Sequence, residues 1–398
     1  MEGNFIKTNE WLLPFSWIYG AVVRFRNFLF DVGVLKSHAF SIPVISVGNL
    51  TVGGTGKTPH VEYLVRLLQD HMGVAVLSRG YKRKTKGYLL ADEKSTAHDI
   101  GDEPYQMKSK FPKAVIAVDK KRVHGIEKLT EDNKDIDVIL LDDAFQHRYV
   151  KPGVNILLVD YHRLIIYDRL LPAGRLREPL SGKNRADIVI VTKCPQELRP
   201  MDFRVITKAM DLYAYQQLFF TTLCYKPLCP VFADEAKPLP ISPDDGVIPN
   251  CLGNYHILLL TGIASPLQML KDIKEATGKT PDMLTFSDHH NFKKKDIDRI
   301  NQTFAALPSP SVIITTEKDA TRLTLSQGLS NEVRQHLYVL PVCVSFLLEQ
   351  KDKFNETIIN YVRKNSRNSI LAQRKDDHKP KDSHRAGNGP RTISFRNY

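Results

Sequence analysis

The sequence contains few cysteines, and the few it has are widely separated. Its 398 residues include five, with no Cys-x-x-Cys pair among them, namely Cys194, Cys224, Cys229, Cys251 and Cys343. An odd number of cysteines at irregular spacing indicates neither a disulfide framework nor a zinc site. We therefore expect a protein that is kept in a reducing compartment.

Long hydrophobic runs are missing from the N-terminal region as well. The apolar run from Trp11 to Val23 is thirteen residues long and is followed by Arg24 and Arg26. A helix needs about 20 apolar residues to cross a bilayer. No positively charged segment precedes the run, and no small-residue cleavage site follows it. Neither a transmembrane helix nor a secretory signal is therefore predicted here.

Residues 1–35 have the pattern of an amphipathic helix. Glycine and polar residues fall on one side of this helix, and the apolar residues on the opposite side are Ile18, Val22, Phe25, Leu29 and Val32. Such a helix can lie in a membrane interface, with Trp11 and Trp17 as aromatic anchors. Packing of the same face against the protein's own domain explains the pattern equally well.

The net charge of +12 is concentrated in one segment of the chain. Residues 363–398 contain ten Lys or Arg and three Asp, and so contribute +7 of that charge. The segment is poor in apolar residues, which predicts a disordered basic tail at 365–398. The tail is either a dispensable extension or an electrostatic contact with anionic lipid. Because it lacks aromatic interleaving and helix-turn-helix patterning, no nucleic-acid partner is expected.

The middle of the chain has the alternating pattern of an α/β protein. Over 36–225, short β-branched runs alternate with helical patterns, which predicts a mostly parallel sheet with helices on both faces, as in P-loop NTPases. The Pro-rich stretch 226–254 is expected to be a linker or hairpin. Alternation resumes over 255–346, which predicts a second, smaller α/β domain, and 347–364 has the pattern of a closing helix.

A glycine-rich loop between a predicted strand and a predicted helix is the strongest local motif. Its glycines allow backbone N–H groups to surround phosphate oxygens, Lys57 can reach the β- and γ-phosphates, and the Thr58 hydroxyl can bind Mg²⁺. The usual P-loop pattern has a glycine where this chain has Thr51. We predict an ATP site formed by Thr51, Val52, Gly53, Gly54, Thr55, Gly56, Lys57 and Thr58.

A second motif supports the first. The apolar run 137–141 ends in Asp142 and Asp143, which places carboxylates at the edge of the sheet where α/β proteins bind ligands. Asp142 can then hold the Mg²⁺ that bridges the ATP phosphates, with Asp143 as a further ligand or a supporting group. Without the P-loop upstream, two aspartates at the end of a strand would more simply form a turn.

Several further motifs occur together with these two, in a fixed order. They are Gly48-Asn49, Gly53 to Pro59, Leu77-Ser78-Arg79-Gly80-Tyr81, Gly101-Asp102-Glu103-Pro104, Asp142 to His147, Leu171-Pro172-Ala173-Gly174, Arg177-Glu178-Pro179-Leu180, Phe286 to His290 and Thr316-Glu317-Lys318-Asp319. From about Phe15 to Val362 the chain resembles the tetraacyldisaccharide 4′-kinases of Gram-negative bacteria. It departs from them at Ala144, where the family usually has Gly, and in the basic tail.

The resemblance implies an activity and a location. The activity is ATP-dependent phosphorylation of the 4′-hydroxyl of an acylated glucosamine disaccharide 1-phosphate, a late step of lipid A biosynthesis, at the cytoplasmic face of the inner membrane. An enzyme with this lipid substrate needs access to the membrane surface, which favours the interfacial reading of residues 1–35. No obligate protein partner is expected.

The resemblance also implies roles for individual residues. Asp102 would be the catalytic base, paired with His289 and acting beside Lys57, although the residues alone favour a helix N-cap role for Asp102. His290 is the alternative to His289. The further implied or candidate residues are Glu178 near the metal, Gln146 and His147 for the sugar or its 1-phosphate, and Arg79 and Arg122 for phosphate charge. No chemical step is assigned to Thr316–Asp319.

A regulatory ATPase with a G-G-x-G-K-T loop is the competing interpretation. In such a protein ATP hydrolysis drives a conformational switch and no substrate is phosphorylated. These proteins often have a lysine directly before the glycine pair, where this chain has Val52. That difference favours the kinase.

Overall fold

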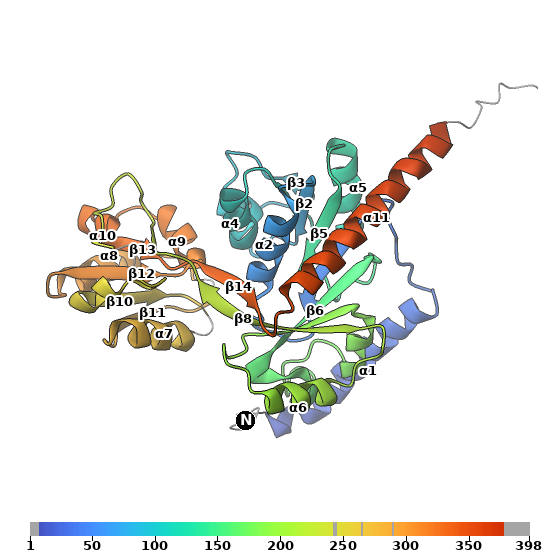
Figure 1. Cartoon of the computed structure of the whole chain (residues 1–398), viewed down its shortest axis with the longest axis horizontal. Helices are drawn as coiled ribbons and strands as arrows, with labels where there is room; N and C mark the ends of the chain where they lie inside the picture. The colour runs from blue at the N-terminus through green and yellow to red at the C-terminus, as the bar shows by residue number, and fades with distance from the viewer. Residues whose placement is uncertain (1–7, 242–244, 264–265, 289, 378–398) are drawn as a thin grey trace, which may run out of the picture.

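The computed structural model describes residues 8–241, 245–263, 266–288 and 290–377. These residues form two units, one on a sheet of nine strands and one on a sheet of five. Figure 1 shows the two units side by side, with strands β8 and β14 extending between them. His289 and residues 378–398, which include most of the predicted tail, lie outside the described residues.

The larger sheet is mostly parallel, in the order β14-β8-β7-β6-β1-β5-β2-β4-β3. Its two edge strands, β14 and β3, pair antiparallel with their neighbours. The strands are β1 (Val44–Asn49), β2 (Val74–Ser78), β3 (Leu89–Leu90), β4 (Val115–Val118), β5 (Val138–Asp142), β6 (Val154–Asp160), β7 (Ile188–Thr192), β8 (Gln217–Tyr225) and β14 (Val342–Phe346). Most of the parallel strands are buried along nearly their whole length, as expected of a sheet covered on both faces.

Helices cover both faces of this sheet. On one face, α2 (Lys57–Leu68), α4 (Asp102–Lys110) and α11 (Lys351–Asp377) pack on a shared core that includes Ile45 and Val47 of β1. On the other, α5 (Arg122–Asp132) and α6 (Pro200–Met210) pack on two further clusters. The short α3 (Ala97–Ile100) precedes α4. The predicted α/β architecture is confirmed.

The smaller unit is also built on a mostly parallel sheet with apolar clusters on both faces. Its sheet has the order β11-β10-β12-β13-β9, in which β9 is the antiparallel strand. The strands are β9 (Cys229–Pro230), β10 (His256–Thr261), β11 (Asp282–Thr285), β12 (Ser311–Thr315) and β13 (Leu337–Val339), and the helices are α7 (Leu267–Thr277), α8 (Lys294–Ala305), α9 (Glu317–Thr324) and α10 (Asn331–His336). Apolar clusters lie on both faces of this sheet.

The borders of the units differ from those expected. β14 falls within 255–346 but pairs with β8 in the larger sheet, because β8 offers an open edge to the returning chain. The stretch 226–254 contributes β9 to the smaller sheet. The closing helix α11 begins at Lys351 and continues past Lys364 to Asp377, into the segment predicted to be a disordered tail. Its buried residues Phe354, Ile358 and Val362 anchor it on the larger core.

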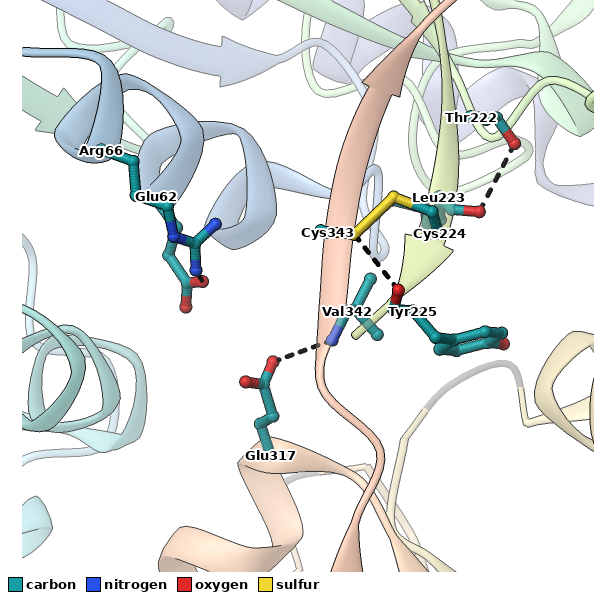
Figure 2. The surroundings of a disulfide bond; sticks show 9 residues. All are labelled: Glu62, Arg66, Thr222, Leu223, Cys224, Tyr225, Glu317, Val342 and Cys343. Atoms are coloured by element: carbon teal, nitrogen blue, oxygen red, sulfur yellow. Dashed lines mark hydrogen bonds and ion pairs between the residues drawn. A yellow bond between two sulfur atoms is a disulfide. The ribbon is translucent and has the colours of Figure 1, made fainter. Parts of the chain in front are cut away.

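A disulfide bond joins the two strands that connect the units. Cys224 on β8 and Cys343 on β14 lie opposite each other, with their Cα atoms 5.0 Å apart (Figure 2). The expectation that the cysteines form no disulfide is therefore wrong for this pair. The two residues are 119 positions apart, and their proximity depends on strand pairing that spacing along the sequence does not reveal.

The N-terminal helix is attached to the protein through its small and polar side. After a short turn, η1 (Glu10–Leu12), α1 extends over Leu13–Asp31. Ser16 Oγ donates to Leu170 O at 3.0 Å and accepts from Ala173 N at 2.9 Å, and Tyr19 Oη donates to Arg177 O at 2.8 Å. Gly20 is buried against Leu170, where a Cβ atom would lie 2.7 Å from Leu170 Cδ1.

The apolar side of α1 faces outward. Trp11 is 91% exposed, and the other exposed apolar residues of the segment are Phe15, Trp17, Ile18, Val22, Phe25, Phe28, Val32 and Val34. Leu29, expected on the same face, is only partly exposed. Packing of this face on the protein's own domain is therefore not what the structure shows. Among the described residues, no helix is long and apolar enough to cross a membrane.

Candidate active site

The glycine-rich loop is positioned by β1 and by a hydrogen bond from the end of β7. β1 pairs with β5 and β6 in the middle of the sheet, and the loop leads from it into α2. Asn49 Nδ2 donates to Thr55 Oγ1 at 3.0 Å, and Thr192 Oγ1 donates to Thr55 O at 3.0 Å. Gly53 and Gly56 have φ angles of +119° and +82°, which glycine adopts without strain. The loop is thus fixed in a form that leads directly into a helix N-terminus.

Thr51, which stands where the usual P-loop pattern has glycine, has a structural role. Thr51 is buried and forms a β-bridge with Leu176. Next to it, Val52 N donates to Arg175 O at 2.8 Å, and Arg177 N donates to Leu50 O at 2.7 Å. The segment containing Arg175 to Arg177 therefore runs beside the loop and supports it. This explains how the loop keeps its position without a glycine at 51.

Two carboxylates lie at the end of β5, beside the loop. Lys57 Nζ is 3.5 Å from Asp143 Oδ1, and Arg177 Nη1 is 3.3 Å from the same oxygen. Burial opposes ionisation of Asp143, but Lys57 and Arg177 outweigh it and lower the pKa of this carboxyl. Asp143 is therefore an anion at neutral pH.

Asp142 differs from its neighbour. It is buried, Ser78 Oγ donates to its Oδ2 at 3.2 Å, and its Oδ1 has no hydrogen-bond partner among the described atoms. Burial and the charge of Asp143 raise the pKa of Asp142 to about 6, and Glu103 contributes in the same direction. A buried carboxylate oxygen without a partner, next to a second carboxylate, is what a divalent cation would satisfy. The residues therefore fit Mg²⁺, which typically takes one or two carboxylates together with phosphate oxygens.

Glu178, which the resemblance places near the metal, is held by partners of its own in this structure, and its role at the metal stays a prediction. In the described part of the chain, no three His, Cys, Asp or Glu side chains form a group that could hold a metal. Glu178 is buried, and its Oε2 accepts from Arg185 at 2.7 Å and from Asn27 of α1 at 3.4 Å. Arg185 compensates its charge, and the residue connects the N-terminal helix to the domain, while its Oε1, like Oδ1 of Asp142, has no hydrogen-bond partner among the described atoms.

The four predicted substrate residues lie around the same end of the sheet. Gln146 Nε2 donates to Asn49 O at 2.6 Å, which ties it to the loop. Burial lowers the pKa of His147 to about 4, and the charges of Arg122, Arg26 and Arg79 act in the same direction. The imidazole is therefore neutral at pH 7 within a cationic group. Sequence reasoning did not find Arg26, because its contribution depends on the placement of α1.

The two arginines of this group differ in accessibility. Arg79 is exposed, whereas Arg122 is buried, with Nη1 donating to Asp119 O at 2.5 Å and Nη2 donating to Asp142 O at 3.1 Å. Burial lowers the pKa of Arg122 to about 10, so it stays charged at neutral pH. Arg79 can meet a ligand directly, while Arg122 supports the backbone behind the carboxylates.

Asp102 is the first residue of α4 and is not its N-cap, which is Gly101. Its Oδ2 accepts from Arg322 Nη2 at 2.6 Å and from Arg322 Nε at 3.1 Å. Arg322 belongs to α9 of the smaller unit, and sequence reasoning did not connect the two. The predicted partner His289 falls outside the described residues. The alternative, His290, stacks on Phe286 and pairs with Asp296 at 2.9 Å within the smaller unit.

Comparison with known proteins matches nearly the whole chain. A family model described as tetraacyldisaccharide-1-P 4′-kinase matches residues 8–363. A tetraacyldisaccharide 4′-kinase of Bacteroides thetaiotaomicron is 54% identical over 95% of this chain and 100% of its own length. A protein of the same name from Phocaeicola vulgatus is 56% identical over 93% of this chain and 99% of its own length.

A solved structure agrees with these matches. A crystal structure of LpxK from Aquifex aeolicus in complex with ATP superposes with a TM-score of 0.67. The two chains are 31% identical, and the match covers 88% of this chain and 98% of the other.

Proposed function

The chain belongs to the tetraacyldisaccharide-1-P 4′-kinase family, and we propose that it transfers the γ-phosphate of ATP to the 4′-hydroxyl of a tetraacyl glucosamine disaccharide 1-phosphate. Membership makes it a kinase of lipid A biosynthesis. The observation that carries the proposal is the cluster of Lys57, Asp142 and Asp143 at the end of the glycine-rich loop. Such a cluster serves phosphoryl transfer, which depends on positioning and on charge stabilisation.

The ATP phosphates are expected to bind at the N-terminus of α2. The backbone N–H groups of Gly53 to Thr58 and the positive end of the helix dipole favour an anion there. Lys57 would turn from Asp143 towards the phosphates. Thr58 and Asp142 would hold Mg²⁺, with Asp143 nearby, and the bound ion would offset charge on the phosphates.

We assign the role of base to Asp102. Glu103, in the first turn of α4, helps to raise the pKa of Asp142 through its charge, which supports a position of this turn near the end of β5. Asp102 would accept the proton of the sugar hydroxyl as the hydroxyl oxygen attacks the γ-phosphorus. His289 would share or orient this proton.

We expect the acceptor to bind beside Arg26, Arg79 and Arg122, the arginines whose charges act on His147. Arg26 comes from that helix, and Arg79, His147 and Gln146 come from the ends of the central strands. A sugar phosphate would find charge from the arginines there and hydrogen bonds from the amide and imidazole groups. Bound there, the phosphorylated headgroup would lie close to α1, the helix that carries the exposed apolar side chains.

That side of α1 would lie in the membrane interface. Its polar side is fixed to the protein by Ser16 and Tyr19, while large apolar residues including Trp11 and Trp17 point away from it. Tryptophan side chains favour the interface between lipid and water. We therefore place the enzyme at the cytoplasmic face of the inner membrane, where its lipid substrate keeps its acyl chains in the bilayer. The basic tail would add electrostatic attraction.

Transfer of label tests this proposal. Purified protein is incubated with γ-labelled ATP, Mg²⁺ and tetraacyldisaccharide 1-phosphate in detergent micelles, and the lipids are separated. A labelled lipid that depends on both ATP and the acceptor is expected. Labelled inorganic phosphate formed at the same rate with and without lipid would instead favour the regulatory ATPase.

A further inference from the structure

The smaller unit touches the first turn of α4 through a helix that has no assigned role. Helix α9 follows Thr316 and packs against α4. Among the described side chains, three ion pairs join the two helices: Lys110 with Glu317, Glu103 with Lys318, and Asp102 with Arg322. The Thr316–Asp319 motif, which had no assigned role, thus begins the helix through which the smaller unit contacts α4.

The ion pair between Asp102 and Arg322 is buried on its arginine side, unlike an ordinary surface pair. The Arg322 side chain is only 4% exposed, although it is a long cationic residue. Its Nη1 lies 3.3 Å from Asp319 Oδ1, while Nε and Nη2 both donate to Asp102 Oδ2. Arginine in such a forked arrangement fixes direction as well as charge. The guanidinium is therefore held between a carboxylate of its own helix and the carboxylate of Asp102.

The carboxylate behind Arg322 is itself anchored. Asp319 is fully buried, and its Oδ2 accepts from Gly262 N at 2.8 Å and from Thr316 Oγ1 at 2.7 Å. Gly262 directly follows β10, an inner strand of the smaller sheet. A chain of contacts thus leads from the core of the smaller unit through Asp319 and Arg322 to Asp102.

A second set of contacts keeps the two helices together. Lys110, at the end of α4, donates to both carboxylate oxygens of buried Glu62 at 2.8 and 2.7 Å and also pairs with Glu317. Glu317 accepts from Val342 N at 3.3 Å, at the start of the returning strand β14 (Figure 2). Ion pairs with α9 therefore hold both ends of α4. The position of the first turn of α4 thus depends on the smaller unit.

We propose that Arg322 is a positioning residue, which sets the direction of the Asp102 carboxylate for proton abstraction from the acceptor hydroxyl. This inference rests on the proposed role of Asp102 as base. It gives the smaller unit a specific task in catalysis, because the arginine and its anchor come from that unit. Arg322 would act through Asp102, to whose Oδ2 both its Nε and its Nη2 donate.

Arg322→Gln tests the proposal. We expect kcat to fall roughly 10- to 100-fold, as a displaced catalytic group does, with KM for ATP nearly unchanged. Arg322→Lys keeps the charge without the fork and should recover part of the loss. Arg334→Gln is the matched control, because Arg334 lies on α10 of the same unit and pairs with Glu235 away from α4. It should leave kcat unchanged.

A double-mutant cycle separates positioning from a general loss of structure. In the Asp102→Asn background, Arg322→Gln should lower kcat no further, because its effect passes through the missing carboxylate. An equal loss in both backgrounds, or a normal kcat for Arg322→Gln, would overturn the inference. If Arg322→Gln does not fold, the same cycle with Arg322→Lys decides. A normal kcat for Asp102→Asn alone would instead refute the base assignment and leave the kinase reaction standing.

Discussion

The Lys57 ammonium nitrogen lies 3.5 Å from Asp143 Oδ1, so the lysine of the glycine-rich loop pairs with the carboxylate that directly follows β5. This contact compensates the charge of Lys57 in the structure. In the proposed reaction the ATP phosphates would take the place of Asp143 as its partner.

Lys57→Ala and Thr58→Ala are each expected to lower kcat by roughly 10²–10³-fold or more, because they remove charge stabilisation or a metal ligand from a prearranged site. Both variants should retain the circular dichroism spectrum and melting temperature of the native protein. Lys128→Ala, which removes an exposed lysine paired with Glu131, is the control and should be fully active. Near-normal lipid phosphorylation by either site variant would refute the P-loop assignment.

Asp142→Asn should stabilise the protein in the absence of ATP and Mg²⁺ while abolishing turnover. The folded-state pKa of Asp142 is about 6, above the ordinary value of 3.8, so the folded protein holds this proton more tightly than the unfolded chain does. Stability is therefore lost as pH rises from about 4 to about 6. At neutral pH the variant should gain up to about 3 kcal/mol in unfolding free energy.

Chemical denaturation of the native protein and of Asp142→Asn at a series of pH values measures this gain. The difference should be greatest above pH 6 and should shrink as pH approaches 4. If the variant is less stable than the native protein at pH 7.5, then Asp142 is not a buried carboxylate that destabilises the fold in the absence of a cation.

The exposed side of α1 should decide membrane binding. Replacement of Trp17, Ile18 and Phe25 by Ser removes apolar side chains that are each more than half exposed. Sedimentation with anionic vesicles should fall strongly, and activity should fall more on a long-chain acceptor than on a short-chain analogue.

The control for this variant replaces Met201 and Leu267, which are equally exposed on other helices, by Ser. It should bind vesicles as the native protein does. Equal losses of activity on long- and short-chain acceptors for the α1 variant would show that the helix has a structural role only.

The disulfide can be counted directly. Alkylation of the denatured chain, prepared without reductant, should label Cys194, Cys229 and Cys251, and reduction should then expose Cys224 and Cys343. The Cα separation of 5.0 Å lies in the range that disulfides need, about 4.4–6.8 Å. Mass spectrometry of the intact chain gives the number of labels. Five labels before reduction would show that the two cysteines remain thiols.

Signals within short segments predicted much of the fold and of the nucleotide site. The glycines around Lys57 and the apolar run before Asp142 each specify a local structure, and parallel pairing of β1 with β5 brings them together. Other contacts join residues far apart in the chain. The Asp102–Arg322 contact depends on how the two units pack, and the Cys224–Cys343 contact depends on the pairing of β8 with β14. Periodicity encodes neither.

The contacts of Glu178 show the same limit. Burial of a carboxylate requires compensation, and Arg185 provides it seven positions later. The second contact, from Asn27, depends on the placement of α1, which the residue pattern around Glu178 does not encode. The expected place of Glu178 near the metal stays a prediction.

The position of the new phosphate on the lipid product tests the proposed reaction most directly. The acceptor is converted with ATP and Mg²⁺, and the product is examined by phosphorus and proton nuclear magnetic resonance. The proposed reaction predicts a phosphomonoester on the 4′-oxygen with the 1-phosphate unchanged. A diphosphate at position 1, or a phosphate on any other hydroxyl, would contradict it.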